Sequence, residues 1–177
     1  EEEVSDDERS FSSKSPLRRI TVILAGVTMN IIFAIVAFSI IISNRGYTEA
    51  RISKLEPNTP AIESGLQVGD KILAIDGSRV FTTTDVSMGI QLSKGKTVDL
   101  LVNRNGKKEN IKVTPRLVDK DGTQMYQVGF HYTPVENPTV LESIKESFNE
   151  TISLVTQTYK GLKMMVTGKV NFKTDVG

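Results

Sequence analysis

A continuous apolar stretch near the start of the chain is its clearest pattern. Ile20–Ile42 has 23 residues, and only Thr21, Thr28, Asn30 and Ser39 among them are polar. A helix of this length measures about 34 Å, enough to cross a hydrocarbon core of about 30 Å. The pattern therefore predicts a transmembrane helix over 20–42. A cleavable signal peptide is the alternative, but the stretch exceeds a usual signal core and no small-residue cleavage site follows it.

Basic residues flank this stretch unevenly. Three of them lie just before it in the arm 1–19, whereas only Arg45 and Arg51 follow closely. Because basic residues concentrate on the cytoplasmic side of membrane helices, we expect the arm 1–19 to be cytoplasmic and the chain after Arg45 to be extracytoplasmic. The acidic beginning of the arm holds too little apolar surface to fold by itself.

One polar residue lies deep inside the expected span. Asn30 carries an amide that usually bonds to another helix at this depth. Ala25 and Gly26 lie close to the same helical face and would let a neighbouring helix approach. We therefore expect Ala25, Gly26 and Asn30 to pack against further membrane helices. The chain starts at Glu1 and stops at Gly177, and we interpret it as an internal fragment of a longer protein.

Beyond Gly46 the pattern changes to short alternating strands and turns. The expected strands lie over 50–55, 71–75, 98–102, 111–113 and 126–132. A short helix should begin at Pro60 and end before Gly65, and a second helix should follow a cap in 82–85 and cover 86–92. Asp76–Gly77 and Asn105–Gly106 are strong turn signals. The fold class we expect over 47–134 is α+β, a small, partly open β-barrel with two helices.

Apolar and polar residues alternate with a helical period in the segment 139–167. Its apolar residues recur every three or four positions, while the charged residues fall between them; the stripe consists of Leu141, Ile144, Phe148, Ile152, Val155, Tyr159, Leu162 and Met165. This pattern predicts an amphipathic helix with too many charges to cross a bilayer. We expect it to lie at the membrane surface, and the alternative is that its stripe packs on the domain 47–134.

Composition and charge exclude several classes of function. The net charge is +1, with 22 basic and 21 acidic residues, so no strong field argues for nucleic acid. There is no cysteine, and His131 is the single histidine. Disulfides and thiolate metal sites are therefore excluded, and the H-E-x-x-H motif of zinc proteases cannot occur in this sequence. We expect no metal bound by this chain and no catalytic residue in it.

The segment "NTPAIESGLQVGDKILAIDG", residues 58–77, resembles the central signature of bacterial PDZ domains. Most of its residues set turns and helix ends, so the motif speaks for the fold. The resemblance implies that a peptide adds as a strand beside a sheet edge and next to a helix, with its carboxylate held by the amides of an apolar-glycine-apolar loop. Upstream of Ile52 there is no such loop.

Val128–Phe130 is the good match to that loop, and its place after the other strands resembles the circularly permuted PDZ arrangement of bacterial proteases. We therefore expect a groove between 127–130 and the helix 86–91. Its candidate residues are Gln127, Val128, Gly129, Phe130, Val86, Met88, Ile90 and Gln91. The alternative for Gly129 is that it only relieves a β-bulge, and for His131 that it is structural or exposed.

The segment "DDERSFSSKSPLRRITVILAGVTMN", residues 6–30, is similar to the lead into the second transmembrane helix of bacterial site-2 proteases, regulated intramembrane zinc metalloproteases. Val27 stands where that family usually has proline, which puts the helix kink in doubt. Residues 168–177 resemble the stretch just before a further conserved motif of the family. In that family a helix like 139–167 follows the PDZ region and helps to control access to the active site.

The resemblance implies a function for the longer protein. It would be a zinc metalloendopeptidase of the bacterial inner membrane, multi-pass, with Zn²⁺ as cofactor and an extracytoplasmic PDZ domain. Its partners would be the lipid bilayer and membrane-protein substrates such as an anti-sigma-factor-like protein already cleaved once, and not nucleic acid. This chain would act as scaffold, substrate filter and gate. The alternatives are a non-catalytic membrane-anchored PDZ adaptor, such as a secretion or assembly component, and the regulatory arm of a serine protease.

Overall fold

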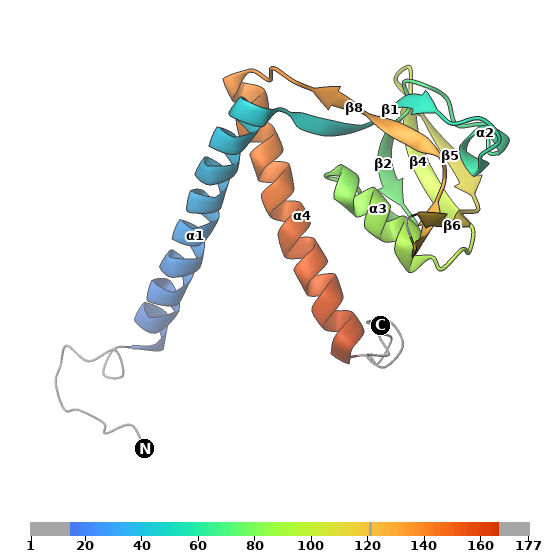
Figure 1. Cartoon of the computed structure of the whole chain (residues 1–177). Helices are drawn as coiled ribbons and strands as arrows, with labels where there is room; N and C mark the ends of the chain where they lie inside the picture. The colour runs from blue at the N-terminus through green and yellow to red at the C-terminus, as the bar shows by residue number, and fades with distance from the viewer. Residues whose placement is uncertain (1–14, 121, 167–177) are drawn as a thin grey trace.

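The structure, a computed structural model, describes residues 15–120 and 122–166. The expectations for most of the arm and for 168–177 lie outside the described residues. Two long helices meet near one end of each and lie beside a smaller domain of strands and short helices (Figure 1). We call this domain, 47–135, the PDZ-like domain.

The first helix, α1 (Pro16–Arg45), contains the apolar stretch and is long and apolar enough to cross a membrane. Proline near its first turn fits the start of a helix, and the N–H of Gly46 closes its end by donating to the Ile42 carbonyl at 2.8 Å. Polar side chains within α1 donate hydrogen bonds to the backbone of the same helix. Thr28 Oγ1, for example, donates to the Leu24 carbonyl at 2.8 Å. Such bonds satisfy hydroxyl groups within the helix itself.

Eight strands and two short helices form the PDZ-like domain. The strands are β1 (Tyr47–Leu55), β2 (Lys71–Ile75), β3 (Ser78–Arg79), β4 (Val98–Arg104), β5 (Lys107–Val113), β6 (Arg116–Lys120), β7 (Thr123–Gln127) and β8 (Phe130–Val135), and the helices are α2 (Pro60–Glu63) and α3 (Thr83–Leu92). The main sheet has the order β5-β4-β2-β1-β8, with β3 paired to β2, while β6 and β7 form a separate hairpin. The main sheet is thus open, with β5 and β8 at its edges.

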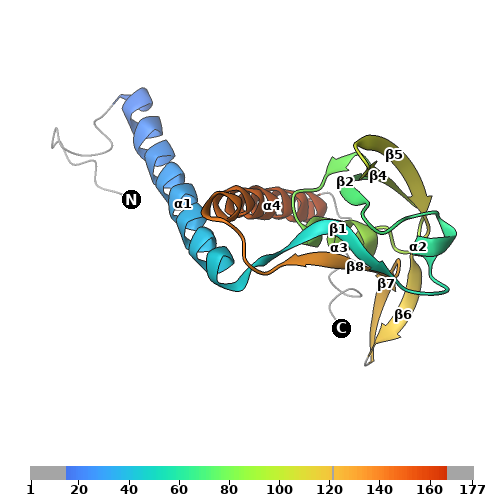
Figure 2. The same ribbon diagram turned by 90° about the horizontal axis from the view of Figure 1, so that it is seen from above.

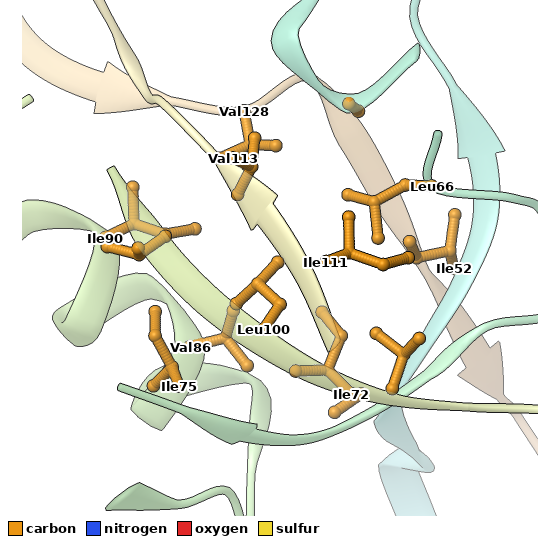
Figure 3. Packing of buried hydrophobic residues seen from close by; sticks show 14 residues of the cluster. Ile52, Leu66, Ile72, Ile75, Val86, Ile90, Leu100, Ile111, Val113 and Val128 are labelled. Atoms are coloured by element: carbon orange, nitrogen blue, oxygen red, sulfur yellow. The ribbon is translucent and has the colours of Figure 1, made fainter. Parts of the chain in front are cut away.

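The core lies between this sheet and α3 (Figure 3). Every second residue of β4 is buried: Val98, Leu100 and Val102 are each at most 1% exposed. Alternate side chains of a strand point to the same face, so these three residues mark the buried face of β4. Val86 from α3 and Ile72 from β2 meet them there. The hydrophobic alternation in the sequence therefore identified the core face of the sheet.

The end of the domain differs from the expected strand 126–132. The backbone breaks at Gly129, whose φ is +91°, so that β7 ends at Gln127 and β8 starts at Phe130. The hairpin partner of β7, the strand β6, was not predicted. All five residues of β6 are exposed. A strand with no buried face need not alternate apolar and polar residues, so its sequence gives no strand signal.

The last helix, α4 (Val140–Val166), contacts the end of α1 near its own start, and the two helices diverge from there (Figures 1 and 2). Ser143, Ser147 and Thr151 recur every four residues on its buried face, and Ser147 Oγ lies 2.8 Å from Ser39 Oγ of α1. The expected apolar stripe is largely exposed instead, with Phe148 at 52%. The stripe therefore does not pack on the PDZ-like domain, which was the alternative to a membrane-surface position.

Candidate functional site

A cavity of about 320 Å³ lies between β8 and α3. Because β8 is an edge strand, its outer backbone groups have no neighbouring strand in the main sheet. The cavity is lined by residues of both elements and of the preceding loop: Ser87, Ile90 and Gln91 from α3, Tyr126 and Gln127 from β7, and Val128, Gly129, Phe130, His131 and Tyr132. We call it the β8–α3 groove.

The loop Val128–Gly129 forms one end of the groove. Its two carbonyls turn away toward α2: the Val128 carbonyl accepts from the Ala61 N–H at 2.9 Å, and the Gly129 carbonyl accepts from the Glu56 N–H at 3.0 Å. Within the described part of the chain, neither the Val128 nor the Gly129 N–H donates a hydrogen bond. The loop thus offers amide donors beside the groove, which is what binding a carboxylate requires.

Gly129 is fixed in this loop by its surroundings. A Cβ at this position would lie 2.7 Å from Thr59 Oγ1 and closer still to the carbon atoms of that side chain. Its φ of +91° also disfavours any residue with a side chain. The register shifts between β1 and β8 lie elsewhere, between Glu49 and Lys54. Gly129 is thus placed by a tight loop against Thr59.

Two of the expected groove residues lie elsewhere, which corrects the sequence-based assignment. Val86 is 0% exposed and belongs to the core. Met88 lines a separate cavity of about 220 Å³ that also contains Lys160 of α4. The reason is helical geometry, because successive residues turn by about 100°, so that Met88 and Ile90 point to opposite sides of α3. Ser87 lies on the groove side of α3 and was missed.

Aromatic side chains of β8 fill the inner wall of the groove. The rings of Phe130 and Tyr132 meet edge to face, with centroids 5.2 Å apart. Burial raises the pKa of the Tyr132 phenol to about 12, although a hydrogen bond with Ser87 acts in the opposite direction. Tyr132 therefore stays neutral at physiological pH and presents an uncharged hydroxyl beside Ser87.

Gln91 clamps the loop end of the groove. Its Nε2 donates to the Tyr126 carbonyl at 2.8 Å, and its Oε1 accepts from the Tyr126 N–H at 3.0 Å. This pair of bonds attaches β7 to α3 just before the Val128–Gly129 loop. The sequence identified Gln91 as a groove residue, but nothing in it indicated the partner.

His131 lies on β8 and is one of the residues that line the groove. Its Nε2 is 2.9 Å from Glu56 Oε1, and both side chains are about half exposed, at 55% and 44%. Within residues 15–120 and 122–166, no group of three His, Asp or Glu side chains is placed so that it could hold a metal ion.

The expected intramembrane packing face is open. Ala25, Gly26 and Asn30 are all exposed, and a Cβ on Gly26 would meet no atom within 4 Å. The contact between α4 and α1 lies further along, near Ser39 and the buried Ile42. No other described helix covers the first half of α1.

A larger cavity of about 790 Å³ separates α4 from the main sheet. Its lining mixes basic and acidic side chains, and Lys71 Nζ there pairs with Glu49 Oε1 at 2.7 Å. This cavity does not include β8 or the Val128–Gly129 loop in its lining. We therefore place the candidate site in the β8–α3 groove.

Comparisons with known proteins agree on one family. The sequence profile of peptidase family M50 matches residues 2–177. CPE1693 of Clostridium perfringens, named as a zinc metalloprotease, is 44% identical over 177 residues, which are 100% of this chain and 52% of that protein. Regulator of sigma-W protease RasP of Bacillus subtilis is 30% identical over 178 residues, 99% of this chain and 42% of that protein.

The solved structures that match part of this chain include a PDZ domain of the SdrC-like protein from Listeria innocua. Its TM-score is 0.43 at 21% identity, and the match covers 51% of this chain and 99% of that domain. The chain spans about half the length, or less, of the two curated relatives above.

Proposed function

Because the chain belongs to peptidase family M50, the site-2 protease family, we propose that it forms the PDZ and membrane portion of an intramembrane zinc metalloendopeptidase. The longer protein would cleave transmembrane substrates, with Zn²⁺ held by residues outside the described part of this chain. The match of the family profile over residues 2–177 favours this function over a non-catalytic PDZ adaptor. A zinc determination on the full-length protein tests it, because a full-length protein free of zinc would contradict the protease.

In this proposal α1 crosses the bacterial inner membrane as one of several spans, with the PDZ-like domain on the extracytoplasmic side. The uneven basic flanks of α1 support this orientation. Ala25, Gly26 and Asn30 would face other membrane helices, because small residues and an amide suit helix contacts in lipid. The exposed apolar stripe of α4 would lie in the membrane interface, where apolar side chains lose their contact with water.

The β8–α3 groove would bind the carboxyl end of a peptide that adds as a further strand to β8. The observation that carries this step is the open edge of β8 together with the two unused N–H groups of the Val128–Gly129 loop. Gln127, Phe130, Ile90 and Gln91 would contact the peptide in addition. Substrates would be membrane proteins with a newly made carboxyl end, such as an anti-sigma-factor-like protein after a first cleavage.

A peptide titration tests the groove. The full chain in lipid nanodiscs is titrated with a pool of fluorescein-labelled nonapeptides of random sequence, once with free carboxyl ends and once as carboxamides. We expect the free acids to bind about tenfold or more tightly, because hydrogen bonds to a charged acceptor contribute about 1.5–3 kcal/mol. Equal binding of both pools, or no binding of either, would contradict a carboxylate-binding groove.

A further inference from the structure

A cluster of buried and partly buried polar side chains joins α4 to the beginning of α3. Ser153 Oγ donates to Asp85 Oδ1 at 2.8 Å, and Gln157 Nε2 donates to the same oxygen at 3.1 Å and to Ser153 Oγ at 2.7 Å. Thr82 Oγ1 lies 3.1 Å from Ser153 Oγ. Ser153 is 1% and Thr82 is 2% exposed. We call these four residues the α3–α4 junction.

The same carboxylate also starts α3. Asp85 Oδ2 accepts the N–H groups of Phe81 at 2.9 Å and Thr82 at 3.0 Å, which would otherwise lack partners at the helix start. Each oxygen of Asp85 therefore has a separate task, one toward the backbone of α3 and one toward α4. Loss of the α4 donors would leave Oδ1 of the partly buried Asp85 without these hydrogen bonds, which is costly.

The helix that starts at this junction is also a wall of the β8–α3 groove. α3 has ten residues, so it spans about 15 Å. Ser87, Ile90 and Gln91 lie on its groove side. A shift of its first turn relative to β8 therefore changes the width of the groove.

The first part of α4 contacts α1. Ser147 Oγ lies 2.8 Å from Ser39 Oγ, and Ser147 precedes Ser153 by about 1.7 helical turns. In Figure 1, α4 lies between α1 and the PDZ-like domain. A single helix thus links the apolar helix α1 to the wall of the groove.

We propose that Ser153 and Gln157 are positioning residues for the β8–α3 groove, acting through Asp85 on α3. This inference rests on the proposed peptide-binding function of that groove. When the hydrogen bonds of the α3–α4 junction are formed, α3 is held in place beside β8. Binding of a peptide then costs less conformational entropy, because the wall of the groove is already ordered. Because coupling between sites is reciprocal, a bound peptide also strengthens the docking of α4 on α3.

The test compares Ser153→Ala with a matched control in the full chain in nanodiscs. Ser143→Ala removes an equally buried hydroxyl of α4, but that hydroxyl donates to the Thr139 carbonyl and not to α3. For Ser153→Ala we expect faster amide hydrogen exchange in the first turn of α3, and peptide affinity about threefold to tenfold weaker, as the loss of one or two hydrogen bonds implies. The control should change neither quantity.

Further readouts separate positioning from general stability. Peptide addition should slow amide exchange in residues 151–158 of the original chain and of Ser143→Ala, but less in Ser153→Ala. Ser153→Thr keeps a hydroxyl and should restore affinity. Unchanged α3 exchange in Ser153→Ala, or faster exchange with unchanged peptide affinity, would overturn the inference alone. If the original chain binds no peptide, the proposed groove function fails first, and the positioning role fails with it.

Discussion

The substitution Gly129→Ala is the sharpest test of the groove loop, and Gly106→Ala is its matched control. Both glycines have positive φ, +91° at Gly129 and +86° at Gly106. A Cβ at Gly106 would meet no atom within 4 Å, whereas at Gly129 it would overlap Thr59. The pair therefore separates the cost of backbone conformation from the cost of the overlap.

The expected magnitudes follow from these contacts. An alanine in the left-handed region costs about 1–2 kcal/mol, which is the whole effect expected for Gly106→Ala. To relieve the overlap at Gly129, the loop must leave Thr59, and the bonds from the Ala61 and Glu56 N–H groups to its carbonyls weaken. Two such bonds contribute about 1–3 kcal/mol together. We expect Gly129→Ala to lower the free energy of unfolding by about 2–5 kcal/mol.

The assay is native-state hydrogen exchange of the full chain in nanodiscs, read at the slowest amides of β4, which report unfolding of the domain. Peptide affinity is measured in parallel and should fall strongly for Gly129→Ala but not for Gly106→Ala. If both variants lose the same stability, Thr59 does not constrain the loop. If Gly129→Ala is destabilised yet binds peptide unchanged, the carboxylate does not sit at Val128–Gly129.

Three further substitutions test polar contacts. Asp70→Asn should cost about 3 kcal/mol of unfolding free energy, because it breaks a pair with Arg104 in which Asp70 is buried. Burial raises the pKa of Asp70, but hydrogen bonds from Arg104 and a backbone amide outweigh this and lower it. The stability that this carboxylate contributes should therefore be constant above about pH 5 and fall as the pH drops further, and the fall should be smaller in Asp70→Asn. Gln91→Ala should speed exchange of the Tyr126 amide about tenfold, the effect of losing one hydrogen bond of about 1.4 kcal/mol. Ser147→Leu should lengthen the distance between spin labels on α1 and α4, because the serine is 0% exposed there, and an unchanged distance would contradict the packing.

Local signals in the sequence were sufficient for much of the domain. Turns such as Asp76–Gly77 were predicted because positive φ, here +47° and +74°, is confined to a few residue types. The core face of β4 was predicted because strand alternation is a local property. The start of α3 at Thr82–Asp85 followed from capping chemistry.

What the sequence did not predict depends on contacts between distant segments. Both oxygens of the Asp85 carboxylate are used, and the partners of one of them lie about 70 positions further along the chain. The clamp between Gln91 and Tyr126 joins two segments 35 positions apart. A polar residue by itself does not indicate its partner. Met88 was assigned to the groove because it is apolar. Apolar character alone does not indicate on which side of α3 a residue lies.

The helix α4 shows why an apolar stripe alone does not locate a buried face. In water the apolar side of an amphipathic helix is expected inside, yet Ser143, Ser147 and Ser153 are the buried residues and Phe148 and Val155 are exposed. Small hydroxyl side chains let two helices approach closely and can bond across the contact, which is how helices associate where lipid removes the hydrophobic gain. The inverted burial of α4 is therefore what a helix with lipid on its apolar side would need.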